Sequence, residues 1–397
     1  MRARAEKSIL NIPLTATVLP LAWLTGANIQ VDSLDKKFKE SMEKLQKKFS
    51  TLFPKAPFTT EIIADEIVDN RIGELPPDKR TGLMFSGGVD SMYSLITHLQ
   101  ENPRMLMMWG VDNFAYPGRR EHWERVTEIY KNFSEKKNLE LYILKTNISQ
   151  ILDTRKIEHQ FHEYLYDGRI RPAIQHSLIL MPATAPLSIG RFDRVLIAAS
   201  SHLGALNQVD KPRATVPELD EMIQWADVQV KHDGYMEKAD KIFGAIAEYL
   251  EEEPLTLRVC KRSRLLNGEV NDSTCEKCLR TIAPLVLLGH DPNKMGFHVD
   301  ESTFPDLKQF WLKMKTPGSS RDWRKLQALI PEVIEKDLYG SREFFEWFRD
   351  FDFKSTEYNW FYTDLYMSLP YKLARLLDKY YQRKNIDVHK GPYRRDR

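Results

Sequence analysis

Apolar residues recur at two spacings along this chain, and each spacing predicts a kind of secondary structure. Within residues 33–50, every third or fourth position is apolar among lysines and glutamates, which predicts an amphipathic helix. Asp32 or Ser33 is available as the N-cap of this helix. The polar, proline-containing stretch 72–80 predicts a linker into a second domain.

From Thr81 onward, short apolar runs alternate with longer amphipathic stretches. This alternation predicts a doubly wound α/β fold, in which helices cover both faces of a parallel sheet. The predicted strands are residues 82–85, 105–111, 139–145 and 194–199, and the predicted helices are residues 90–100, 119–136, 172–188 and 235–251. Beyond residue 300 the pattern predicts helices near 303–314, 321–336, 340–350 and 358–383.

These changes of pattern divide the chain into four predicted regions. They are an N-terminal extension (1–75), an α/β domain (76–255), a cysteine-bearing loop region (256–300) and a mostly helical C-terminal region with a basic tail (301–397). A length of 397 residues agrees with a core that carries appended pieces, because single domains seldom exceed about 250 residues.

The composition limits the classes of protein that fit. Lys+Arg total 58 and Asp+Glu total 56, so the net charge gives no general reason to expect binding to nucleic acid or a membrane surface. All three cysteines fall within residues 260–278, which favours a metal or thiol site in a reducing compartment, the cytoplasm, over a disulfide framework. The start of the chain imitates a signal peptide, but Asn11, Thr15 and Thr17 interrupt its apolar run. No stretch reaches the roughly 20 apolar residues of a membrane span.

The string SGGVDS at residues 86–91 stands between a predicted strand and a predicted helix. Two adjacent glycines let backbone N–H groups approach a phosphate, and the positive end of the following helix favours its negative charge. Ser86 and Ser91 add hydroxyl donors, and Asp90, expected in a solvent-reachable loop, is suited to hold Mg²⁺ against the phosphates. Glycines and serines also occur in ordinary turns, but the whole string in this context favours phosphate binding.

With this motif, the chain resembles the PP-loop ATP pyrophosphatases, HUP-like adenine nucleotide alpha hydrolases that include 7-cyano-7-deazaguanine synthase, NAD synthetase, GMP synthetase and tRNA thiolation enzymes. The resemblance implies that ATP is cleaved between its α- and β-phosphates and that a substrate oxygen becomes an adenylate. It implies catalytic roles for Ser86, Asp90 and Ser91. The implied nucleotide contacts are Phe85, Ser86, Gly87, Gly88, Val89, Asp90 and Ser91, with Gly110, Val111, Asp112 and Asn147 at the ends of the next two strands. Gly110 as a plain turn and Asp112 as a solvated cap remain an equal alternative.

Cys260, Cys275 and Cys278 form a C-x14-C-x2-C pattern, which has zinc-ligand spacing but lacks the fourth ligand of a structural site. Together with the Leu-Arg after Cys278 and the later Asp-Pro, the pattern is similar to the C-terminal part of 7-cyano-7-deazaguanine synthase. That resemblance implies a Zn²⁺ site in which Asp272 stands where the family has a further cysteine. The alternatives are three buried thiols without a metal, or a redox pair of Cys275 and Cys278.

Polar residues after the fourth predicted strand are candidates for the substrate side of the crevice. Ser200 and Ser201 follow that strand directly, and Asp220 lies in a proline-acidic stretch similar to one in the deazaguanine enzymes. His176 is a further candidate, although a lone helical histidine is more often packed or on the surface. The string His232-Asp233-Gly234 is also consistent with a simple turn.

Three functions follow from these patterns. The first is an enzyme that adenylates a small-molecule or deazapurine-like carboxylate, or an amide oxygen, for attack by a nitrogen nucleophile, with a protein or nucleic acid as a further candidate acceptor. The second is a tRNA-modifying thiolation or ligation enzyme, and the third is a nucleotide-binding regulatory subunit without turnover. The extra terminal regions resemble those of PP-loop proteins found in antiviral defence operons. Oligomerisation is open, and no membrane partner is expected.

Overall fold

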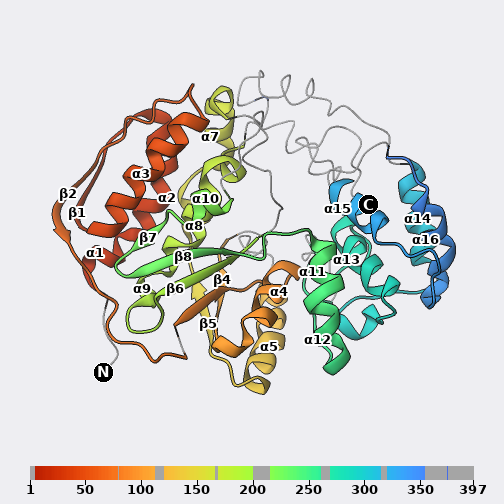
Figure 1. The fold of residues 1–397 in the computed structure, drawn as a ribbon. Helices are drawn as coiled ribbons and strands as arrows, with labels where there is room; N and C mark the ends of the chain where they lie inside the picture. Colours follow the sequence, from red (N-terminus) through yellow and green to blue (C-terminus); the bar gives the residue numbers. More distant parts are fainter. Residues whose placement is uncertain are drawn as a thin grey trace.

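The computed structural model describes residues 5–78, 80–111, 120–165, 169–199, 215–260, 269–313 and 320–353, together with Leu373. Within these residues, six strands form one sheet in the order β5-β4-β3-β6-β8-β7 (Figure 1). The strands are β3 (Thr81–Met84), β4 (Arg104–Trp109), β5 (Leu141–Lys145), β6 (Arg194–Ala198), β7 (Gln224–Trp225) and β8 (Val228–Asp233). Neighbouring strands are parallel except β7, which is antiparallel to β8. The chain is therefore an α/β protein with a mostly parallel sheet.

The strand order reverses beside β3. From β3 the chain adds β4 and β5 on one side, and it then returns to place β6 and β8 on the other side. In the register, Leu83 pairs with Leu196, which in turn pairs with Lys231. Because these strands are parallel, their carboxyl ends meet at one edge of the sheet, where β3 and β6 are neighbours.

Alternate side chains of the central strands enter two apolar clusters, one on each face of the sheet. Met105 and Met107 of β4 belong to the cluster that includes residues of α4 (Val89–Thr97), α5 (Arg120–Lys136) and α13 (Glu276–Leu287). Leu106 and Met108 belong to the cluster that includes residues of α2 (Ile12–Thr25) and α8 (His176–Leu180). Apolar residues therefore cover both faces of the sheet, which explains why the central strands β3, β4 and β6 are predicted from short, continuous apolar runs, whereas β7 and β8 are not predicted.

The N-terminal region packs on the face that α2 covers. It comprises α1 (Lys7–Leu10), α2, β1 (Ile29–Asp35), α3 (Lys36–Leu52) and β2 (Ile62–Val68), and β1 and β2 form a separate parallel pair. Helix α3 is the predicted amphipathic helix, but its predicted N-caps are wrong. Asp32 and Ser33 lie within β1, and the carboxylate of Asp35 accepts the Phe38 N–H at 2.8 Å.

Two predicted helices are interrupted. The predicted helix 172–188 is divided into a π-helix (Arg171–Gln175), α8, a 3-10 helix (Pro182–Thr184) and α9 (Ala185–Ser188), and Pro182 lacks a backbone N–H. The predicted helix 235–251 appears as α11 (Lys238–Lys241) and α12 (Ala247–Glu252), because the backbone at Gly244 is not helical. No described helix is long and apolar enough to cross a membrane.

The C-terminal region adds α14 (Thr303–Lys313), α15 (Ser320–Ala328) and α16 (Ser341–Arg349) beside α13 (Figure 1). Their aromatic side chains, among them Trp311 and Trp323, are buried in the same cluster as α4 and α13. The predicted helix 321–336 ends at Ala328, shortly before Pro331. The predicted helix 358–383 lies outside the described residues except for Leu373.

Candidate functional site

The SGGVDS string forms a tight turn from β3 into α4, with Gly88 as the N-cap of the helix. The Ser86 N–H donates to Ser91 Oγ at 3.2 Å, and Ser91 Oγ donates to the Gly88 carbonyl at 3.2 Å. Ser91 is buried and Ser86 is exposed. The Ser91 hydroxyl therefore stabilises the turn through hydrogen bonds inside it. The first backbone N–H groups of α4 lie at the carboxyl edge of the sheet, where they favour binding of an anion.

The second residue of the turn, Gly87, lies where no side chain fits. Its φ of +75° is in the left-handed region, and a Cβ would lie 2.1 Å from the Tyr130 hydroxyl. The Gly87 carbonyl accepts the Tyr130 hydroxyl at 3.1 Å and the Arg258 N–H at 2.7 Å. The turn is thus held by α5 and by the segment that leads into the cysteine loop.

Asp90 lies in the first turn of α4 and forms ion pairs with two lysines of α11. Lys241 Nζ is 2.7 Å from Asp90 Oδ1, and Lys238 Nζ contacts Oδ2. The exposed fractions of the side chains are 20% for Asp90, 11% for Lys238 and 0% for Lys241. Burial alone would raise the pKa of Asp90, but the two ammonium groups outweigh it and lower the pKa to about 2. The prediction that Asp90 lies in a solvent-reachable loop is therefore wrong. Asp90 lies in helix α4 and is charged.

Lys241 also joins the turn to the neighbouring strand. Its Nζ donates to the carbonyl of Ala199, the residue after β6, at 2.6 Å and lies 5.7 Å from the centre of the Tyr93 ring. Burial lowers the pKa of Lys241 and Asp90 opposes that effect. Asp233 also acts on Lys241, and Glu237 interacts with Lys238, so the two ammonium groups lie among several acidic side chains next to the glycine turn.

The predicted nucleotide contacts on β4 and β5 come together in part. Gly110 has a φ of +104°, and a Cβ there would lie 1.6 Å from the Thr146 carbonyl oxygen, so the two strand ends touch. Phe85 and Val111 are buried, and Asn147 is exposed at the start of α6 (Ile148–Ile151). Asp112 lies outside the described residues. Gly110 therefore marks a close approach of the backbone to Thr146, as in the turn alternative.

The four candidate metal ligands come together. One ligand atom each from Cys260, Asp272, Cys275 and Cys278 lies within 4.8 Å of the others. Cys275 Sγ and Cys278 Sγ are 3.4 Å apart, and all three cysteines are buried and form no disulfide. Hydrogen bonding to Cys275, with a smaller effect of burial, raises the pKa of Cys260 to about 12. A tetrahedral zinc site needs sulfur atoms about 3.8 Å apart, so this Cys3Asp group could hold a metal ion with small adjustments.

Asn271 is the residue that shapes this loop. Its buried amide accepts the N–H groups of Val259 (2.8 Å) and Cys260 (3.0 Å). It also donates to the carbonyls of Leu257 and Gly296, both at 2.7 Å. These four hydrogen bonds place Cys260 next to the CxxC segment and connect it, through Arg258, to Gly87.

Two of the predicted substrate-side residues lie near each other: burial raises the pKa of Asp220, and His232, Ser177 and His176 oppose this effect. Asp220 ends α10 (Pro217–Asp220) and lies 2.8 Å from Nδ1 of His232 in β8. His176 begins α8, and its Nδ1 lies 3.2 Å from Thr215 Oγ1. Ser200 and Ser201 lie outside the described residues. His232 is in a strand, so the simple-turn interpretation of His232-Asp233-Gly234 holds only for the residues after Asp233.

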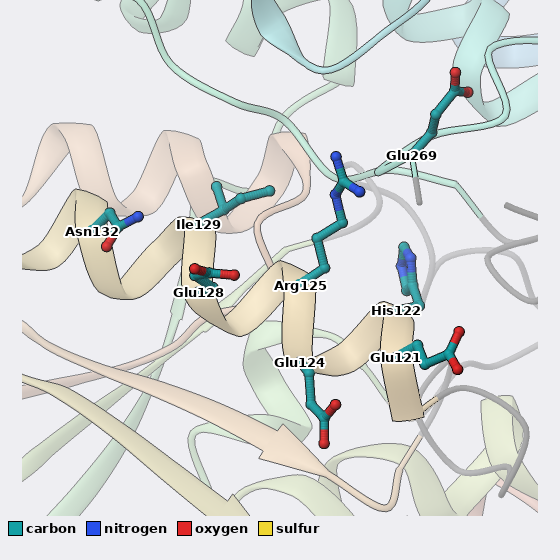
Figure 2. A pocket seen from close by; sticks show the side chains of 8 residues that line it. All are labelled: Glu121, His122, Glu124, Arg125, Glu128, Ile129, Asn132 and Glu269. Carbon is teal, nitrogen blue, oxygen red and sulfur yellow. The ribbon is translucent and has the colours of Figure 1, made fainter. Parts of the chain in front are cut away.

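A cleft of about 530 Å³ lies along one side of α5, apart from the glycine turn. Figure 2 shows that its lining side chains come from α5 and from Glu269, toward which Arg125 points. Four of the eight lining residues are glutamates, and none is a predicted site residue. The cleft therefore contributes no group to the candidate site.

Four residues of the site carry no signal in the sequence: Lys238, Lys241, Arg258 and Asn271, whereas His232 belongs to the string His232-Asp233-Gly234 that the sequence already marks. Lys238 and Lys241 follow Asp90 by 148 and 151 residues, and no motif or spacing near them marks a site. Asn271 stands beside the predicted ligand Asp272, but its side chain acts on backbone groups that the sequence does not identify. These residues reach the turn and the cysteine loop through the tertiary fold, and no local sequence pattern reveals them.

No protein-family model matches the sequence, and comparisons with curated proteins and with solved structures also give no match.

Proposed function

We propose that this chain is an AMP-forming ATP pyrophosphatase of the PP-loop type, which adenylates a substrate carboxylate or amide oxygen. The observation that carries the proposal is the glycine turn with two lysines at the edge of the sheet where the strand order reverses. A doubly wound sheet binds its ligand at this point, outside the carboxyl ends of its strands. The order β5-β4-β3-β6-β8 is the one expected for such a sheet.

The chemistry needs positive charge where pyrophosphate leaves. The backbone N–H groups at the start of α4 and the hydroxyl of exposed Ser86 can hold the β- and γ-phosphates. Lys238 and Lys241 supply cations beside them, and Asp90 holds both ammonium groups in place. Mg²⁺, when bound with the nucleotide, would neutralise phosphate charge, and Asp90 is its candidate ligand only if a lysine releases one carboxylate oxygen.

Zn²⁺ is the metal that best fits the Cys3Asp group, because thiolates and a carboxylate in tetrahedral arrangement are typical zinc ligands. We assign it a structural role. The Asn271 hydrogen bonds hold Cys260 and the residues on either side of Arg258, and the Arg258 N–H donates to the Gly87 carbonyl, so the site supports the turn. Cysteines outside disulfides and the need for ATP also favour a cytoplasmic location.

Pyrophosphate release tests the proposal. Purified protein is incubated with ATP, Mg²⁺ and a panel of carboxylates that includes 7-carboxy-7-deazaguanine. We expect release with at least one carboxylate and a loss of about 100-fold or more in Lys238→Met, since a cation aimed at the leaving group is removed. Lys325→Met is the matched control, because Lys325 also pairs with α11, through Asp240 at 2.9 Å.

Two results would replace the proposal. An iron-containing brown protein that transfers sulfur to tRNA would favour the thiolation enzyme, whereas stoichiometric colourless zinc agrees with the adenylating enzyme. ATP binding without pyrophosphate release under every condition would favour a regulatory subunit.

A further inference from the structure

Glu237 is a buried carboxyl group at the start of α11, the helix that carries both lysines of the candidate site. Its carbonyl accepts the Lys241 N–H at 3.2 Å in the first turn of this helix. The side chain of Glu237 caps no backbone group of α11, and the residue is only 8% exposed. Because Lys238 is the next residue and Lys241 is one turn further on, the position of Glu237 sets the positions of both lysines.

Helix α11 lies between α4 and α15 and contacts both (Figure 1). A partly exposed ion pair joins α11 to α15, with Lys325 Nζ 2.9 Å from Asp240 Oδ1. The buried link is formed by Glu237, whose carboxyl group is hydrogen-bonded to that of Asp322 in α15. The guanidinium group of Arg280 in α13 holds Asp322 from another side. The lysines of α11 thus meet α4, while a carboxyl pair connects the same helix to α15.

A hydrogen bond between two carboxyl groups needs a proton on one of them. Arg280 pairs with Asp322, which favours Asp322 as the carboxylate and Glu237 as the donor. Burial, the hydrogen bond to Asp322 and the negative charges of Asp322 and Asp240 raise the pKa of Glu237 to about 7, and Lys238 opposes them. Glu237 therefore carries a proton below neutral pH and loses it above.

The charged groups beside the carboxyl pair come from α11 and from three neighbouring helices. Among the described residues they are Lys238, Asp240 and Lys241 of α11, Asp90 of α4, Asp322 and Lys325 of α15, and Glu276 and Arg280 of α13. The cations among them are already paired, Arg280 with Asp322 and Glu276, Lys325 with Asp240, and the two lysines of the site with Asp90. A second negative charge on the pair would therefore meet little compensation.

We propose that Glu237 positions Lys238 and Lys241 for the pyrophosphate group of ATP and that it does so only while it carries a proton. This inference rests on the proposed function. With the proton in place, the hydrogen bond to Asp322 connects α11 to α15 and holds both lysines beside the glycine turn. Without it, two carboxylates face each other in a buried place, and their repulsion moves the start of α11 away from α15. Pyrophosphate release should therefore be fast below neutral pH and slow above it.

The test compares pyrophosphate release by the full chain at pH 6.5 and pH 8.5, with ATP, Mg²⁺ and the carboxylate panel. The wild type should lose about tenfold between these values, since a group with a pKa of about 7 gives up most of its protons over this range. Glu237→Gln should keep its pH 6.5 rate at pH 8.5, because the amide donates the same hydrogen bond at both. Glu237→Ala, which removes the bond, should be slow at both. Glu248→Gln, which changes an exposed carboxylate of α12, is the control and should follow the wild type.

Infrared spectroscopy detects the proton without the reaction. At pH 6, the difference between the spectra of the wild type and Glu237→Gln should contain the C=O band of one protonated carboxyl group. This band should disappear as the pH rises to 8.5.

The outcomes separate this inference from the proposed function. If the wild type releases no pyrophosphate at either pH although the band is present, the proposed function fails and the role of Glu237 fails with it. If the wild type releases pyrophosphate and Glu237→Gln shows the same pH profile, Glu237 does not position the lysines. A missing band would show that Glu237 carries no proton, which also overturns the inference. Loss of release in Glu237→Gln at both pH values, with unchanged thermal unfolding, would mean that Glu237 acts as an acid or base.

Discussion

At the scale of single residues, the two glycines of the turn have different tasks. Gly87 has a positive φ and touches the Tyr130 hydroxyl, so it is required by the fold. Gly88 has a φ of −78°, and the nearest atoms to a built Cβ, Arg258 O and Ser86 Oγ, are 3.5 Å away. The structure tolerates a methyl group at Gly88, and only a ligand close to the backbone would reject it.

This difference gives a matched pair of variants. Gly87→Ala should lower the free energy of unfolding by about 2 kcal/mol or more, because it adds backbone strain and a clash. Gly88→Ala should change it by less than about 1 kcal/mol and yet abolish pyrophosphate release. Urea unfolding and a pyrophosphate assay on the same samples measure both. Full activity in Gly88→Ala would mean that phosphates do not bind at this turn.

The ion pairs of Asp90 predict a dependence of stability on pH. The pKa of Asp90 is about 2 in the folded chain, against about 4 in an unfolded one. Because the folded value is lower, the pairs stabilise the fold above pH 4, and this contribution, about 2.5 kcal/mol, is lost as the pH falls through 2. Asp90→Asn should therefore be less stable than the wild type at pH 6, with a gap that is roughly half closed at pH 3.

Urea unfolding at both pH values measures this gap. Asp65→Asn, which removes an exposed carboxylate from β2, is the control and should show little change at either pH. A gap between Asp90→Asn and the wild type that does not narrow with acid would contradict the assigned pairing. Since Asp90→Asn leaves two buried ammonium groups without their carboxylate, Gly88→Ala is the better variant for testing activity alone.

At the scale of elements, Asn271 connects the metal ligands to the turn. Asn271→Ala should remove four hydrogen bonds, lower the free energy of unfolding by about 3 kcal/mol and reduce the zinc content of the purified protein. Asn293→Ala is the matched control, because its exposed amide makes three hydrogen bonds to Val299 and Tyr339 away from the cysteines. Elemental analysis measures the zinc content of both variants, and urea unfolding measures their stability. Equal zinc content and stability in the two variants would remove this role of Asn271.

Some of the strands can be predicted from the sequence and others cannot. Strands β3, β4 and β6 are predicted because burial on both faces makes them continuous apolar runs, and the edge strand β5 is predicted from its apolar residues although none of them is fully buried. Strand β8 is missed because polar Gln229 and Lys231 alternate with its valines, and β1 and β2 are missed because exposed residues interrupt them. Local motifs such as SGGVDS and CxxC are found because their parts are adjacent, whereas the lysines of α11 reach Asp90 only through the fold.

At the scale of the whole molecule, the candidate site is part of a larger packed body. One apolar cluster contains Phe85 and Val89 of the turn region, the three cysteines, and the buried tryptophans of α14 and α15. The N-terminal region shares the second cluster with the opposite face of the sheet. Both appended regions therefore share apolar clusters with the sheet that positions the turn.

The most direct test of ATP cleavage at the SGGVDS turn is the identity of the nucleotide product. The chain is incubated with ATP labelled at the α-phosphate, Mg²⁺, the carboxylate panel and ammonium chloride, and the nucleotides are separated. We predict labelled AMP and an equal amount of pyrophosphate in the wild type, and neither in Gly88→Ala. Labelled ADP as the main product, or AMP formed equally by Gly88→Ala, would contradict the account.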